Sequence, residues 1–240
     1  MQVLASSPQA IEVRPANLPA PTIARPAVNS SLEEQLAQGT LRRVEAKEHL
    51  FADGDKKAFV YLVLTGAICL YKILPDGRRQ VIDFAYPGDL IGLGSGPVET
   101  LNAQATVATR VKCLPLGTLH KAAAQDPRIA LHLYEALSRE ITAMHEHLIS
   151  VGQRSATERL VGFLMALSQR NETQGSDPET VELPMTRADI GDFLGLTIET
   201  VSRTFSKLKA AGLIEIDQGT TIRLVDTLRL ASLADGESCH

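Results

Sequence analysis

The sequence predicts an α+β protein made of an N-terminal antiparallel β-roll, a long helix and a C-terminal winged helix-turn-helix. Three observations lead to this prediction. Short β-rich runs separated by glycine-containing turns recur from Leu41 to Leu116, as in an antiparallel roll or sandwich. A helical heptad pattern follows from Asp126 to Arg154. Two short helical patterns separated by Gly195 then precede two β-rich runs, which is the order of a winged helix-turn-helix.

The expected domain organisation has four parts. Residues 1–28 are expected to be a disordered tail, because prolines interrupt them repeatedly and no periodic pattern is present. The β-roll is expected over residues 29–125, the dimerisation helix over 126–154 and the winged helix-turn-helix over 155–240. With 240 residues, of which 44% are apolar, the chain is long and apolar enough to form such cores.

Charge and cysteine usage limit the class of protein. The formal net charge of −4 does not by itself favour a nucleic-acid partner, although a locally basic face is what contacts phosphate. Cys69, Cys113 and Cys239 are far apart and form no C-x-x-C pair, which argues against a disulfide scaffold or a zinc ribbon. A reducing cytoplasm is therefore the expected location. No apolar run reaches the roughly 18 residues that cross a bilayer, so no membrane contact is expected.

Within the roll, four β-rich runs are expected to form strands, separated by turn signals such as Pro75-Asp76-Gly77. The runs are Phe59–Leu64, Ile68–Leu74, Gln80–Tyr86 and Gln104–Leu114. A short helix is expected before them, from Ser31 as its N-cap to Gly39.

The helix from Asp126 to Arg154 carries a narrow apolar stripe whose members alternate at spacings of three and four residues. The stripe consists of Tyr134, Leu137, Ile141, Met144, Leu148 and Val151. Such a seam is typical of a coiled-coil pair, so these residues are expected to form the interface of a homodimer. The alternative is a helix that packs on its own domain. Its histidines, His132, His145 and His147, lack the spacing of the strong metal motifs, and no metal site is expected.

A second helix is expected from Ala156 to Gln169, because apolar residues recur on one of its faces. The next eleven residues, 170–180, are polar and rich in turn formers. A surface loop is therefore expected there.

The final part of the chain has the signals of two short helices joined by a tight turn. Thr186 and Asp189 form a capping box for the first helix, Arg187–Leu194, and Thr197 caps the second, Ile198–Ala210. Apolar residues are expected to lock the two helices together. They are Ile190, Leu194, Leu196, Ile198, Val201, Phe205 and Leu208.

Two strand-like runs around Gln218 and Gly219 follow these helices and predict a hairpin, or wing. A short last helix is expected from Asp226 to Ala234. Together with the two preceding helices, these elements complete a winged helix-turn-helix.

Near the start of the second short helix, Glu199, Ser202 and Arg203 share one helix face, because they lie at i, i+3 and i+4. In a helix-turn-helix, residues at this place contact base edges in the major groove. Arginine donates two hydrogen bonds to guanine, glutamate accepts one from cytosine and serine bonds to several bases. These three residues are the expected base readers. The alternative is an exposed Glu199–Arg203 ion pair worth only about 0.3–0.5 kcal/mol.

Six further residues are expected to contact DNA phosphates. Four lie at the starts of the two short helices, and two are lysines farther along the helix that carries the expected base readers. They are Thr186, Arg187, Thr197, Thr200, Lys207 and Lys209. The helix Ile198–Ala210 carries three basic residues against one acidic residue, so it is locally basic in an acidic protein.

This order of roll, long helix and winged helix-turn-helix resembles the CRP/FNR family of bacterial transcription regulators from Leu41 to Leu233. The stretch TRADIGDFLGLTIETVSRTFSKLKAAGLI is very similar to the family signature, and its E-x-x-S-R pattern resembles the FNR/FixK branch. The resemblance implies a cyclic-nucleotide-binding-like roll, a homodimer and a palindromic site of the type TTGA…TCAA in double-stranded DNA. It also implies that Glu199 and Arg203 read the G·C pairs, assisted by Ser202. RNA polymerase would be a partner, contacted in part around residues 75–79.

The sequence lacks the family's known effector sites. Members of the family that bind cyclic nucleotides carry a Gly-Glu pair and an arginine that binds the phosphate. In this sequence, which resembles them, no glutamate follows Gly92 and no arginine is present near residues 102–104, where that arginine is expected. Without that cation the phosphate has no counter-charge. The iron–sulfur cluster of FNR needs four cysteine ligands. Only Cys113 in this sequence resembles one of them, the cysteine of the β-roll. The resemblance therefore implies a FixK-type activator without a cofactor. Such regulators act in microaerobic or anaerobic metabolism or nitrogen fixation, downstream of a separate sensor.

A ligand-gated regulator of the same fold, with an unknown small molecule in the roll, is the alternative. A cyclic-nucleotide module that does not bind DNA would have no use for the E-T-V-S-R stretch. An enzyme is not expected, and no catalytic residue is predicted, because the sequence holds no Ser-His-Asp or Cys-His arrangement, P-loop or zinc spacing.

Overall fold

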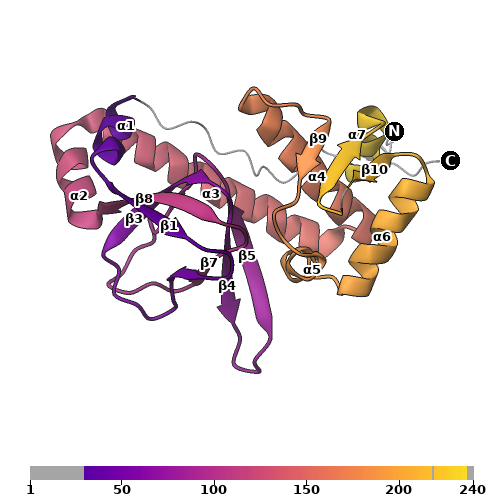
Figure 1. The fold of residues 1–240 in the computed structure, drawn as a ribbon, viewed down its shortest axis with the longest axis horizontal. Coiled ribbons are helices and arrows are strands. Elements are labelled where there is room, and N and C mark those ends of the chain that lie inside the picture. The colour runs from indigo at the N-terminus through magenta and orange to yellow at the C-terminus, as the bar shows by residue number, and fades with distance from the viewer. Residues whose placement is uncertain (1–29, 218, 237–240) are drawn as a thin grey trace, which may run out of the picture.

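The structure is a computed structural model that describes residues 30–217 and 219–236. The tail expected over residues 1–28 lies outside the described residues, as does Cys239. Figure 1 shows the roll and the helical C-terminal part at opposite ends of the molecule, with the long helix α3 running past both. No helix in the described part of the chain is long and apolar enough to pass through a bilayer.

Eight antiparallel strands form two four-stranded sheets, with strand orders β1-β8-β3-β6 and β2-β7-β4-β5. The strands are β1 (Thr40–Val44), β2 (His49–Phe51), β3 (Phe59–Thr65), β4 (Ile68–Ile73), β5 (Arg79–Ala85), β6 (Leu90–Ile91), β7 (Asn102–Ala105) and β8 (Thr109–Pro115). Val63, Ile68 and Val111 are fully buried between the sheets. The predicted antiparallel roll is therefore confirmed.

The single strand expected over Gln104–Leu114 was wrong, because the chain changes sheets within it. Strand β7 belongs to one sheet and β8 to the other. At the crossing, the buried Thr109 hydroxyl accepts a hydrogen bond from the Ala67 backbone N–H at 3.1 Å. A Cβ on Gly66, whose φ is +83°, would lie 2.4 Å from this hydroxyl oxygen. The change of sheet thus depends on a close approach between Gly66 and Thr109. The alternation of apolar and polar residues along the sequence does not reveal this approach.

Two helices cover one end of the roll. They are α1 (Ser30–Ala37) and α2 (Leu116–Gln125). Helix α1 agrees with the expected short helix, whereas α2 was not predicted. Leu119 and Ala122 of α2 are buried with Leu36 and Ile129 in a small apolar cluster, so packing against neighbouring helices stabilises this short segment.

Helix α3 (Pro127–Gln153) has two faces with different environments. Ile129, His132 and Ser150 are buried against its own chain. The heptad stripe lies elsewhere on the helix: Tyr134 is 68% and Leu148 71% exposed. Leu137, Ile141 and Met144 are also exposed and Val151 is half-buried. The two interpretations of this helix are therefore compatible, because one face packs on the chain and the other is left open.

The C-terminal part contains four helices and a three-stranded sheet of order β10-β11-β9. The elements are α4 (Ala156–Thr173), β9 (Thr180–Glu182), α5 (Arg187–Leu194), α6 (Ile198–Ala210), β10 (Ile214–Asp217), β11 (Thr221–Leu224) and α7 (Thr227–Ala234). The predicted bounds of α5, α6, α7 and the wing hairpin agree with these, whereas α4 is longer than predicted. Strand β9 was not predicted; it begins at the last residue of the expected surface loop.

The expected loop over residues 170–180 was also wrong at its start, because α4 continues to Thr173. Arg170 is buried there. Its Nη1 lies 3.1 Å from Oδ1 of Asp89, with the two side chains 4% and 1% exposed. Its Nη2 donates to the Pro87 carbonyl at 2.6 Å. The two partners lie 81 and 83 residues away in the roll, so the local polar composition gave no sign of this buried cation.

The roll and the C-terminal part share one apolar core. Phe84 of β5 packs against Phe163 of α4 and Phe193 of α5, with ring centroids 5.5–6.3 Å apart. One apolar core therefore contains residues from both sides of the domain boundary expected near residue 155.

Removal of the Arg170 guanidinium should destabilise this junction. Arg170→Met takes a cation away from a buried carboxylate, which typically costs about 3–5 kcal/mol, and equilibrium unfolding in urea measures the loss. Arg128→Met is the matched control, because the Arg128–Asp126 pair is exposed and should contribute little. The double variant Arg170→Met/Asp89→Leu should regain part of the stability. An Arg170→Met midpoint equal to that of the wild type would contradict a stabilising role.

Candidate nucleic-acid interface

Helices α5 and α6 are joined by a tight turn that two glycines permit. Gly195 ends α5 with a left-handed φ of +64°, a conformation that costs glycine little. A Cβ on Gly191 would lie 2.7 Å from the Leu196 carbonyl oxygen, so α5 packs directly on the turn. The Thr186–Asp189 capping box and the Thr197 cap of α6 are both formed as predicted. The sequence signals therefore fix this local geometry.

The apolar lock between the two helices is formed by six of the seven predicted residues. Val201, Phe205 and Leu208 of α6 are buried, as are Ile190 and Leu194 of α5. The half-buried Leu196 packs against the same core. The prediction for Ile198 was wrong, because this residue is 46% exposed at the start of α6.

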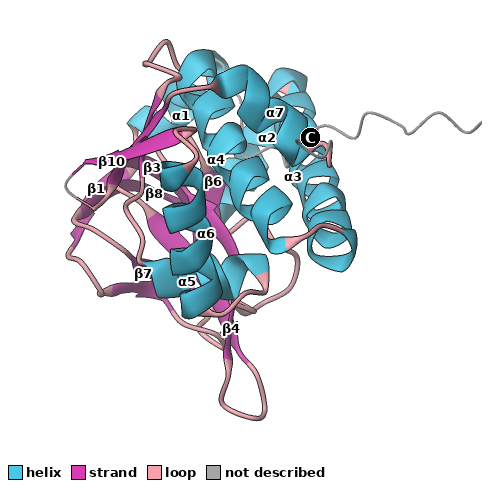
Figure 2. Ribbon diagram, turned by 90° about the vertical axis from the view of Figure 1, so that its right-hand side faces the viewer, coloured by secondary structure: helices cyan, strands magenta, loops and turns pink. Residues whose placement is uncertain are grey.

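Glu199, Ser202 and Arg203 are all exposed on α6. Among the ion pairs of the described residues there is none between Glu199 and Arg203. Within the described part of the chain, Arg203 makes one long side-chain contact, 3.4 Å from Nη2 to Oγ1 of Thr200. Figure 1 shows α6 farther from the roll than α5, and in Figure 2 α6 lies toward the viewer. Three polar side chains thus lie on an accessible helix face.

Most of the predicted phosphate-contacting residues lie around this face. Thr197 and Thr200 are joined through their hydroxyl oxygens, 3.0 Å apart, at the start of α6. Thr186 is exposed at the start of α5, where its hydroxyl donates to Asp189. Lys207 and Lys209 are exposed in the last turn of α6. The helix therefore presents basic side chains at one end and hydroxyl groups at the other.

Arg187 has a different environment. Its guanidinium carbon lies 3.5 Å from the centre of the Phe205 ring, and Nη2 reaches the Gly219 carbonyl of the wing at 3.4 Å. Burial lowers the pKa of this arginine. These contacts favour a role in holding the wing against α6 rather than in contacting a phosphate directly.

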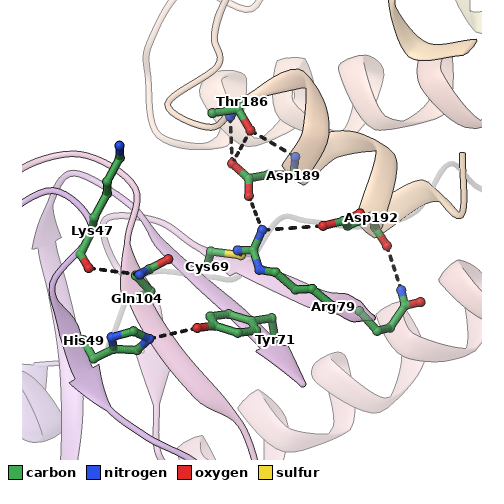
Figure 3. A network of polar contacts seen from close by, with 10 residues as sticks. Lys47, His49, Cys69, Tyr71, Arg79, Gln104, Thr186, Asp189 and Asp192 are labelled. Carbon is green, nitrogen blue, oxygen red and sulfur yellow. Dashed lines mark hydrogen bonds and ion pairs between the residues drawn. The ribbon is translucent and has the colours of Figure 1, made fainter. Parts of the chain in front are cut away.

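A polar contact between β5 and α5 was not anticipated (Figure 3). Arg79 of β5 forms an ion pair with Asp189, and a longer one of 3.5 Å with Asp192. Gln80 Nε2 donates to the Asp192 carbonyl at 2.7 Å. Burial alone would raise the pKa of Asp189, but hydrogen bonds from Arg79 and Thr186 hold that pKa below its usual value. This set of residues is called the β5–α5 contact below.

The two described cysteines are buried and unreactive in character. Burial raises the pKa of Cys69 to about 12, and the neighbouring Arg79 offsets only part of that rise. Burial also raises the pKa of Cys113. The described residues contain no group of three potential metal ligands.

A cavity of about 200 Å³ lies between the roll and α3. A buried ion pair lines it: Lys57 Nζ lies 3.2 Å from Oε2 of Glu99 and donates to the Gly94 carbonyl at 3.0 Å. Leu137 and Ile141 of the heptad stripe line its other side. Residues 102–104 contain no arginine, as the sequence shows, and the cation at this cavity is Lys57, which precedes β3. It is already paired with a carboxylate, so it offers little free charge to a phosphate.

Comparison with known proteins places both parts of the chain. The family model of the Crp-like helix-turn-helix domain matches residues 158–233. The model of the cyclic nucleotide-binding domain matches residues 41–126. The first covers α5, α6 and the wing, and the second covers the β-roll.

Relatives match most of the chain. The nitrogen fixation regulation protein FixK of Bradyrhizobium diazoefficiens is 39% identical over 187 residues, which are 78% of each chain. The transcriptional activatory protein AadR of Rhodopseudomonas palustris is 38% identical over 84% of this chain and 83% of that protein. The solved structure of FixK2 from Bradyrhizobium japonicum has a TM-score of 0.77 and 35% identity, over 84% of this chain and 98% of that chain.

These relatives are transcription regulators rather than enzymes, as the sequence predicts. Their similarity supports DNA binding by a dimeric regulator. The chain belongs to the CRP/FNR family of sequence-specific DNA-binding transcription regulators, in its FNR/FixK branch.

Proposed function

We propose that this regulator binds an FNR-like palindrome of the type TTGA…TCAA as a homodimer and activates genes of microaerobic or anaerobic metabolism or of nitrogen fixation. The observation that carries the proposal is the exposed triad of Glu199, Ser202 and Arg203 on α6. In this arrangement Arg203 donates to guanine, Glu199 accepts from cytosine and Ser202 assists. The names of the FixK and AadR relatives support nitrogen fixation and activation.

The six stripe residues of α3 form the proposed dimer interface. Apolar side chains as exposed as Tyr134 and Leu148 are typical of a surface that is covered in the working protein. Pairing α3 with its copy by two-fold symmetry would present two α6 helices to successive major grooves, about 34–36 Å apart. Lys207, Lys209 and the helix-start threonines would then lie near phosphates and set the orientation on the duplex.

RNA polymerase is the proposed partner for activation, and the cytoplasm is the proposed location. The turn at Pro75–Arg78 is exposed and is available for such a contact. Arg79 is not, because its guanidinium is turned toward α5.

A gel shift with untreated protein in air tests the proposal. A duplex with TTGA…TCAA should be bound in preference to a scrambled duplex of the same length, without an added effector. Equal binding to both duplexes would remove the proposed specificity.

Arg203→Ala should weaken binding to the palindrome by about 1–3 kcal/mol and relax the preference at one base pair. Fluorescence anisotropy with single-base variants of the half-site measures both effects. Arg203→Lys keeps the charge but loses the two-pronged donor, so it should show a similar loss of preference. If both variants weaken all duplexes alike, Arg203 contacts a phosphate instead.

Leu148→Asp should give monomers, because it places a charge in the proposed α3–α3 seam. Sedimentation velocity measures the oligomeric state, and DNA binding should fall with it. Leu228→Asp is the matched control: Leu228 is 83% exposed but lies on α7, away from α3. A Leu148→Asp protein that stays dimeric would exclude this residue from the interface.

The cavity beside Lys57 and Glu99 favours one second candidate, a regulator gated by a small molecule. The cavity lies against stripe residues of α3, so an occupant could alter the dimer seam. Native mass spectrometry of the purified protein should then detect a bound compound that is lost in Lys57→Met. A ligand-free protein that binds the palindrome fully would rule this candidate out.

A further inference from the structure

The connection between α3 and α4 does not by itself fix the helix-turn-helix. Only Arg154 and Ser155 separate the end of α3 at Gln153 from the start of α4 at Ala156. Both residues have extended backbone conformations. Side-chain contacts must therefore determine how the C-terminal part is oriented on α3 and the roll.

Helix α5 is held at both of its ends, by different parts of the chain. At its C-terminal end, Arg159 of α4 donates to the Leu194 carbonyl at 3.1 Å, and His147 of α3 stacks on Phe193 with centroids 4.2 Å apart. At its N-terminal end, Asp189 is bound by Arg79 of β5. The β5–α5 contact thus attaches α5 to the roll through polar groups, whereas the C-terminal end of α5 packs on Phe84 of the roll as well as on α3 and α4.

The Arg79 side chain is itself fixed from several sides (Figure 3). Its guanidinium carbon lies 4.3 Å from the centre of the Tyr71 ring, and the Tyr71 hydroxyl lies 2.8 Å from His49 Nε2. Its Nη2 lies 3.2 Å from the sulfur of Cys69. Because these contacts already restrict its rotamers, the Arg79 side chain loses little more conformational entropy when it pairs with the two carboxylates. It therefore holds α5 in one orientation.

Asp189 has two functions in this arrangement. It is the N3 residue of α5, whose side chain completes the capping box with Thr186. It is also the main partner of Arg79. The ion pair therefore acts on the helix backbone at its first turn. Because the apolar lock joins α5 to α6, any movement of α5 relative to the roll carries α6 with it.

From these contacts we propose that Arg79 is a positioning residue for DNA binding, which sets the half-site spacing that the dimer accepts. The proposal rests on the proposed dimeric function. Arg79 does not touch the DNA in this account. It anchors α5 to the roll, so that the two α6 helices of a dimer keep the separation of successive major grooves. Without this anchor, each α6 samples a wider range of positions about the 154–155 connection.

The test compares duplexes that carry the same half-sites with spacers one or two base pairs longer or shorter. Wild-type protein should prefer one spacer. Arg79→Gln should bind that spacer about tenfold more weakly, as expected when a charge-assisted hydrogen bond is lost, and should lose much of its discrimination against the other spacers. Fluorescence anisotropy with each duplex measures the ratios.

Arg43→Gln is the matched control. Arg43 of β1 is exposed, and among the ion pairs of the described residues it pairs with the nearby exposed Glu45. The variant makes the same change of charge but should keep the wild-type affinity and spacer preference. A second variant, Gln80→Ala, removes the hydrogen bond to the Asp192 carbonyl and should shift the spacer ratios in the same direction as Arg79→Gln. It tests the proposal even if Arg79→Gln fails to fold.

The outcomes separate this inference from the proposed function. If the wild type shows no preference for the palindrome over a scrambled duplex, the proposed function fails. If the wild type prefers one spacer and folded Arg79→Gln keeps the same ratios, the positioning role is wrong. A loss of affinity that is equal for all spacers would also overturn it, since it would indicate a general structural role.

Discussion

The placement of the helix-turn-helix depends on two arginines, one buried and one half-buried, that pair with carboxylates across the boundary between the roll and the C-terminal part. Arg170 of α4 reaches Asp89 in the roll, and Arg79 of the roll reaches Asp189 of α5. Charges removed from water are tolerated only with such partners. The partners thereby select one relative orientation of the two parts, because a displaced α5 or α4 would leave a shielded charge without its counter-charge.

The apolar contact between the same two parts is less specific. Phe84, Phe163 and Phe193 bury large surfaces, which favours association but fixes direction weakly. Hydrogen bonds have preferred geometries, and the fork of an arginine is directional. The aromatic cluster and the two ion pairs therefore have complementary effects: the first stabilises the junction and the second orients it.

Helix α3 belongs to both the roll and the proposed dimer. Its inner face is buried with Ile129 and His132, while Tyr134 and Leu148 on the stripe are open. Leu137 and Ile141 also line the cavity that contains the Lys57–Glu99 pair. The proposed dimer interface and the lining of the roll cavity thus share side chains.

The sequence alone determined the features that depend on neighbours along the chain. The caps at Thr186 and Thr197, the glycine at 195 and the helix bounds of α5 and α6 were all predicted, because capping and left-handed turns are local interactions. The heptad stripe of α3 was visible for the same reason. The face shared by Glu199, Ser202 and Arg203 followed from helical periodicity.

Only the tertiary structure decided which polar residues are buried. Arg170 was assigned to a surface loop but is buried against Asp89, and the buried pair of Lys57 and Glu99 was not predicted. Arg187 was expected at a phosphate but stacks on Phe205. In each case the deciding partner lies far away in the sequence or on another element. The physical reason is that burial of a charge depends on which distant groups the fold brings beside it, and no local pattern of residue types records that.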